Sequence, residues 1–150
     1  MRTQIKNIAL VLVTTISLFS CTPDEEVIKT ASPKNVAPID GKSFTADKAL
    51  QPITFRWTPV VPKPQQPVIY RLKVWQLMQG QNGTQAMRSN PPIVTKDVDN
   101  ITETTVSGIY TGPCKPPYLC DFVWSVQAIA ADGTTLGENE GTSAVTQFNF

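Results

Sequence analysis

The stretch "DFVWSVQAIAADG", residues 121–133, decides the fold that the sequence predicts. Apolar side chains occupy alternate positions through its first half, and the turn-forming dipeptide Asp132-Gly133 closes it. Alternate residues of a β-strand point to the same face of a sheet, so this pattern predicts a strand with one buried face that ends in a turn. The residues expected to point inward are Phe122, Trp124, Val126 and Ala128.

The same alternation recurs along the chain. The inward sets that it predicts are Ile53, Phe55 and Trp57 in "PITFRWTPV" (52–60), Tyr70, Leu72 and Val74 in "VIYRLKVWQL" (68–77), and Ala144, Thr146, Phe148 and Phe150 in "TSAVTQFNF" (142–150). Weaker strand candidates are "PPIVTKDV" (91–98), "TTVSGIY" (104–110) and a Pro-led first strand near "SPKNVAPIDGKSF" (32–44). No helical stripe of useful length follows Cys21. Short strands separated by Pro, Gly and Asn turns predict an all-β, all-antiparallel sandwich, which needs about 100 residues.

The order of these pieces resembles the fibronectin type III domain, an immunoglobulin-like β-sandwich, in the variant common in surface lipoproteins of Bacteroidetes-type bacteria. The resemblance covers about residues 33–150 and rests on "FRW" for strand B, "YRLKV" for strand C and the 122–133 pattern for strand F. It implies that Trp57 and Trp124 form the central packing, where each ring buries on the order of 200 Å². The segment is longer than the usual domain, and its cysteine pair lies between strands E and F.

The amino terminus has the pattern of an export signal. Arg2 and Lys6 precede a twelve-residue apolar run, residues 8–19, which is too short to cross a bilayer that needs about 20 residues. Residues 18–21, "LFSC", resemble the lipobox of bacterial lipoproteins, and this implies cleavage before Cys21 and lipidation of Cys21. The expected organisation is a signal peptide over 1–20, a flexible acidic linker over 21–32 and the sandwich over 33–150. The alternative is an ordinary secretory signal with a stray cysteine.

Three acids follow the expected lipidation site, at positions 24–26. They resemble the signal that exports Bacteroidetes-type lipoproteins to the outer face of the outer membrane, which implies a lipid-anchored, surface-facing protein. The alternatives are a solvated linker and a periplasmic location. Removal of Arg2 and Lys6 from the 13 basic residues leaves 11 against 12 acidic residues, a net charge of −1. Since no basic stripe remains, nucleic acid is not an expected partner.

The remaining cysteines, Cys114 and Cys120, form an even pair in "CKPPYLC". An oxidising compartment permits a local disulfide between them, whose expected role is to stiffen one loop. Two thiolates without histidine supply only half of a structural zinc site, so no metal is expected.

The types of residue present argue against catalysis. The chain contains no histidine, which removes the commonest general base, the usual zinc ligand and the serine triad. Asp97, Asp99 and Glu103 cluster in "DVDNITE" (97–103), but this stretch lacks the Gly-centred twelve-residue calcium loop and is interpreted as a solvated turn. The sequence therefore predicts no enzyme, no cofactor and no metal site.

Two places are candidates for binding. Alternation in the 68–77 strand sends Trp75 to the outer face beside Arg71 and Lys73, which suggests an aromatic platform for a sugar or a protein. The alternative is that residues 60–67 or 79–92 fold back and cover this ring. The second place is the cysteine loop, at the end of the domain opposite the tether, with Tyr118 as its exposed aromatic contact.

These inferences combine into one functional prediction. The chain is expected to be an outer-membrane lipoprotein that acts as a non-catalytic binding or adhesion module for a protein or glycan partner. The alternative is a structural accessory subunit or spacer of a multiprotein cell-envelope complex, with no free ligand.

Overall fold

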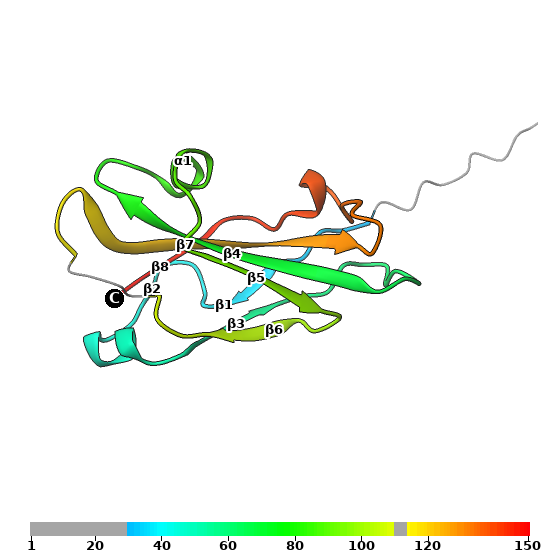
Figure 1. The fold of residues 1–150 in the computed structure, drawn as a ribbon, viewed down its shortest axis with the longest axis horizontal. Helices are drawn as coiled ribbons and strands as arrows, with labels where there is room; N and C mark the ends of the chain where they lie inside the picture. Colours follow the sequence, from blue (N-terminus) through cyan, green and yellow to red (C-terminus); the bar gives the residue numbers. More distant parts are fainter. Residues whose placement is uncertain (1–29, 110–113) are drawn as a thin grey trace, which may run out of the picture.

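The computed structural model describes residues 30–109 and 114–150, which form two layers of β-strands (Figure 1). The signal peptide, Cys21 and the acidic cluster lie outside the described residues. The elements in chain order are β1 (Asn35–Ala37), β2 (Lys42–Ser43), the 3-10 helix η1 (Ala46–Leu50), β3 (Ile53–Trp57), β4 (Val68–Met78), α1 (Gly83–Ser89), β5 (Val94–Asp99), β6 (Glu103–Val106), β7 (Tyr118–Ala130), the 3-10 helix η2 (Asn139–Gly141) and β8 (Thr146–Asn149).

The strands form two sheets that pack on each other. One has three strands in the order β1-β3-β6, and the other has five in the order β2-β8-β7-β4-β5. The chain is thus mostly β, with two sheets that share one core, an arrangement consistent with a β-sandwich.

The core contains the residues that the alternation predicted. In β3 every second residue is buried, and in β7 Phe122, Trp124, Val126 and Ala128 are all buried. The Phe55 ring of one sheet lies 5.1 Å, centroid to centroid, from the Trp124 ring of the other, in an edge-to-face contact that joins the layers. Ala144 was expected to point inward, but it is exposed and lies before β8. The last strand is therefore shorter than predicted.

The prediction that all strands are antiparallel is wrong for one pair. The expected first strand is broken at Pro38: β1 pairs with β3, whereas β2 pairs in parallel with β8 in the other sheet. The crossing is held by the Asp40 carboxylate, which accepts a hydrogen bond from the Gln147 backbone N–H at 2.9 Å. Gly41 N–H donates to the Gln147 carbonyl at the same distance. The first strand therefore contributes to the edges of both sheets.

The sequence shows no helical stripe after Cys21, yet a short helix, α1, forms between β4 and β5. Asn82 caps it: the Gln85 N–H donates to the Asn82 side chain, and the Asn82 N–H donates to the Gln85 side chain, both at 2.9 Å. Its seven residues are too few for a clear apolar period. Across residues 30–109 and 114–150, no helix has both the length and the apolar character needed to cross a membrane.

The chain enters the fold between two connections at one end of the sandwich. Ala31 forms a β-bridge with Val61 in the β3–β4 connection, and the Ser32 hydroxyl donates to the Glu138 carbonyl in the β7–β8 connection. The segment that precedes the described part is thus attached at this end, which we call the entry end.

Candidate functional site

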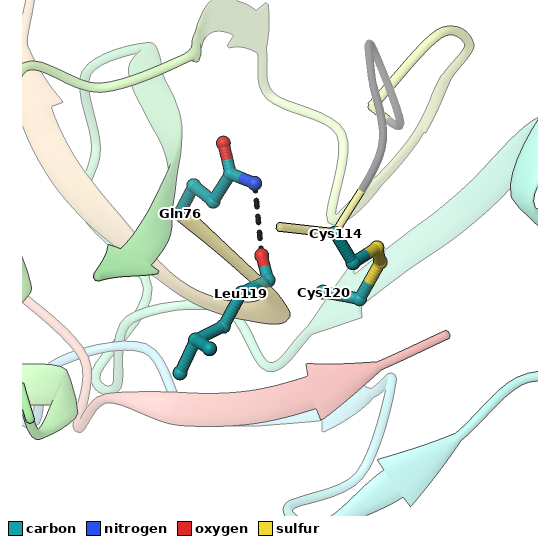
Figure 2. The surroundings of a disulfide bond; sticks show 4 residues. All are labelled: Gln76, Cys114, Leu119 and Cys120. Atoms are coloured by element: carbon teal, nitrogen blue, oxygen red, sulfur yellow. Dashed lines mark hydrogen bonds between the residues drawn. A yellow bond between two sulfur atoms is a disulfide. The ribbon is translucent and has the colours of Figure 1, made fainter. Parts of the chain in front are cut away.

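The cysteine pair lies at the end of the sandwich opposite the entry end, which we call the distal end (Figure 1). Cys120 is the third residue of β7, and Cys114 lies in the β6–β7 connection. Their Cα atoms are 5.1 Å apart, within the range that a disulfide spans. Figure 2 shows the two sulfur atoms meeting beside the start of the strand.

Three hydrogen bonds, two from β4 and the residue after it and one from Phe150, hold the cysteine loop, residues 114–120, against the sheet. The Gln76 side-chain amide of β4 donates to the Leu119 carbonyl at 2.8 Å (Figure 2). The Gln79 N–H donates to the Pro117 carbonyl at 2.7 Å, and the Phe150 N–H donates to the Cys120 carbonyl at 3.2 Å. The loop therefore has fixed backbone contacts in addition to its cross-link.

Tyr118 begins β7 within this loop, and its side chain is 49% exposed. It pairs with Met78 of β4 after a register shift. An exposed aromatic ring on a braced backbone loses little conformational entropy on binding, so Tyr118 as a contact residue stays a prediction that its exposure permits.

Trp75 does not form an exposed platform. Its side chain is only 5% exposed, because α1 covers the outer face of β4 and β7 there. Trp75 and Leu77 of β4, Val123 of β7 and Ala86 of α1 form a second buried cluster, with Met87 and Val145 packed against it. The structure thus matches the alternative in which residues 79–92 fold back over the ring.

Gly83, at the start of α1, shows how closely the helix approaches this sheet. A Cβ atom at this position would lie 2.9 Å from a Val123 methyl carbon and 3.0 Å from a Val145 methyl carbon. The sequence signal for this cover is the Asn82-x-x-Gln85 capping box, which marks the start of a helix that apolar periodicity does not reveal.

Arg71 and Lys73 lie in the middle of β4, away from the cysteine loop. Arg71 donates two hydrogen bonds of 2.8 Å to the Asp97 carboxylate of β5, and these raise the pKa of Arg71 and lower that of Asp97. Lys73 lowers the pKa of Asp97 further through its charge. Met78, the partner of Tyr118, lies seven positions after Arg71 in β4, a span of about 23 Å in a strand. The structure therefore does not bring the candidate binding residues into one site.

The acidic stretch 97–103 covers the end of β5, a three-residue connection and the start of β6. Glu103 lies 3.5 Å from Arg56 of β3, and the side chain of Asn100 accepts a hydrogen bond from the Val68 N–H. Within the described residues, no group of three or more Cys, Asp or Glu side chains is placed to hold a metal ion.

Two hollows were not foreseen from the sequence. One, of about 600 Å³, lies at the entry end under the Pro-rich β3–β4 connection and is lined by Lys63, Asn100 and the buried Tyr70, whose hydroxyl accepts a hydrogen bond from the Val60 N–H. The other, of about 440 Å³, lies where the first strand changes sheets and is lined by Lys42 and Lys48. The residues that line each hollow form no sequence pattern that would have predicted it.

No protein-family model and no curated protein sequence matches the chain.

Proposed function

We propose that the chain is a surface-facing outer-membrane lipoprotein in which a fibronectin type III-like domain acts as a non-catalytic binding or adhesion module. The observation that carries this proposal is the separation of the two ends of the domain. The chain enters through Ala31 and Ser32, whereas the braced cysteine loop with exposed Tyr118 lies at the far end (Figure 1).

The strand arrangement supports the fibronectin type III resemblance. The predicted strands B, C and F correspond to β3, β4 and β7, and β4 and β7 are neighbours in one sheet while β3 lies in the other. A tether at the entry end would direct the cysteine loop away from the membrane. Acyl chains on Cys21 would supply the tether, at about 0.8 kcal/mol for each buried methylene.

Protease treatment of intact cells tests the location. Full-length chain should be degraded by external protease while a periplasmic marker protein stays intact. The variant Cys21→Ala, which cannot be lipidated, should lose its membrane association and its exposure. Full protection of the unmodified chain in intact cells would contradict surface display.

A binding assay tests the activity. Whole cells carrying the chain are applied to glycan and extracellular-protein arrays, and bound cells are compared with those carrying Tyr118→Ala. The matched control is Val61→Ala, which removes another exposed apolar side chain, 58% exposed, at the entry end. We expect Tyr118→Ala to reduce binding and Val61→Ala to leave it unchanged.

The same experiments separate the competing function. A spacer subunit would co-purify in fixed stoichiometry with a membrane complex and would give no array signal in any variant. Array binding that is insensitive to Tyr118→Ala would keep the binding function and move it away from the cysteine loop.

A further inference from the structure

The hollow at the sheet crossing lies where the first strand leaves the three-stranded sheet. Its walls are apolar and include Ile39, Phe44 and Ile53, and its polar boundary is formed by Lys42, Lys48 and Thr54. Among the residues that the structure describes, no acidic side chain lines it. An apolar hollow of several hundred Å³ with a few polar groups at its edge is typical of a binding site.

The backbone beside this hollow has an open edge. The Trp57 N–H donates to the Thr102 carbonyl at 3.0 Å, so the residues of β3 that alternate with Trp57 turn their N–H and C=O groups away from β6. These are Arg56 and Thr54. Arg56 pairs with Ala37, the last residue of β1, but no strand in the described part of the chain lies beside Thr54, because the chain crosses to β8 there.

The hollow also exposes apolar surface at its mouth. Ile39, in the crossing segment, is 65% exposed although it forms one wall. Lys48 of the 3-10 helix η1 lines the hollow, and Leu50, two residues further along that helix, is 80% exposed. An exposed aliphatic wall beside an open strand edge marks an interaction surface.

The charge at the hollow is positive. The Lys42 ammonium lies 5.6 Å from the centre of the Phe44 ring, and the Lys48 ammonium donates to the Gln51 side chain at 2.7 Å. Within residues 30–109 and 114–150, the close ion pairs are those of Arg56 and Arg71, so neither lysine is held in a salt bridge. A hydrogen bond from the Thr45 side chain and, to a smaller extent, the charge of Lys48 lower the pKa of Asp47, whereas Lys42 has no described carboxylate in ion-pair contact. The charge complement of this surface is an acidic side chain.

We propose that an extended segment of a partner protein adds to β3 at Thr54, in the place that the first strand vacates. The segment runs antiparallel to β3, exchanges backbone hydrogen bonds with Thr54, inserts an aliphatic side chain into the hollow and presents acidic side chains to Lys42 and Lys48. Strand addition takes affinity from backbone hydrogen bonds and specificity from pockets for alternate side chains, and this site offers both. The inference goes beyond the proposed function, because it involves neither the cysteine loop nor the membrane anchor.

The test uses the purified full-length chain and a fluorescein-labelled peptide of about six residues in which Glu and Ile alternate. Fluorescence anisotropy should show saturable binding. A peptide with the same side chains but methylated backbone nitrogens cannot pair with a strand, and a Lys–Ile peptide has the wrong charge. Each should bind at least about tenfold more weakly.

Two variants locate the site. Thr54→Pro removes the N–H that faces the open edge and breaks no bond to β6, so it should abolish binding while the circular dichroism spectrum is retained. Should Thr54→Pro fail to fold, the double variant Lys42→Glu/Lys48→Glu tests the same site through its charge and should weaken binding at least about tenfold. The matched control is Lys34→Glu/Lys63→Glu, which reverses two exposed lysines near the entry end.

The outcomes are distinct. Equal binding of the methylated peptide would overturn strand addition in favour of simple adsorption of an acidic amphiphile. Equal weakening by the control double variant would overturn the location. Because the assay involves neither lipidation nor Tyr118, failure of the proposed function at the cysteine loop would leave these results unaffected.

Discussion

Replacement of Trp75 by alanine tests how the outer face of β4 is used. In the structure the ring is 5% exposed and is packed between the sheet and α1. A buried tryptophan removes on the order of 200 Å² from water, which at about 25 cal/mol/Å² corresponds to about 5 kcal/mol as an upper bound. Measured losses for Phe or Trp to Ala in protein cores are about 3–5 kcal/mol. We expect Trp75→Ala to lower the free energy of unfolding by that amount.

Urea denaturation followed by far-ultraviolet circular dichroism measures this loss without depending on tryptophan fluorescence. With a slope of about 2 kcal/mol per molar urea, the midpoint should fall by about 2 M. Tyr118→Ala is the control, because its ring is 49% exposed and should change stability by less than about 1 kcal/mol. A loss below about 1 kcal/mol for Trp75→Ala would refute the buried position and would restore the solvent-facing platform.

Three further predictions concern single features of the structure. Asn82→Ala removes the cap of α1 and should cost about 1 kcal/mol in the same urea assay, whereas Asn82→Asp, which keeps an acceptor, should cost less. The Arg71 hydrogen bond lowers the pKa of Asp97 from its usual 3.8, so the stabilisation by this carboxylate is present above pH 3.8 and is lost as the pH falls below 3.8 through the folded-state pKa. Since the Arg71 and Asp97 side chains are 38% and 45% exposed, Asp97→Asn should lower the free energy of unfolding by well under about 1 kcal/mol at neutral pH. Urea titrations at several pH values should show that the difference in stability between the variant and the unmodified chain vanishes in acid. An equal difference at all pH values would contradict the pairing. Cys114→Ser/Cys120→Ser should keep the circular dichroism spectrum, lose about 2 kcal/mol of stability and weaken any binding through the cysteine loop, and unchanged array binding would remove that loop from the site.

The sequence predicted the strands best where one face is buried and the other is wet. In β3, Ile53, Phe55 and Trp57 alternate with exposed residues, so the period of two was visible and correct. β4 follows the same rule as far as Val74 and then departs from it, because Trp75 is buried on the opposite face. The position of a covering helix is set by the tertiary structure. Residues 83–89 contain too little apolar periodicity to predict that a helix forms there or which face of the sheet it covers.

The sheet crossing was missed for a related reason. Local alternation gives the faces of a strand but not its neighbour, and the pairing of Lys42 with Phe148 joins residues more than a hundred positions apart. Pro38 marked a break in the strand without showing where the chain would go. The lysines of the hollow at this crossing, Lys42 and Lys48, lie in ordinary polar sequence and acquire a shared environment only after the fold is formed.

β5 forms the outer edge of the five-stranded sheet, and the ammonium group of its Lys96 reaches across to the Thr105 carbonyl of β6. Antiparallel pairing of β5 with the β5 of a second molecule would set odd-numbered residues opposite odd-numbered ones and even-numbered residues opposite even-numbered ones, because only every second residue turns its backbone groups to the partner. The two registers with the greatest overlap then set Lys96 against Lys96 or Asp97 against Asp97. Like charges oppose both arrangements, so this edge resists pairing with the same edge of a second molecule.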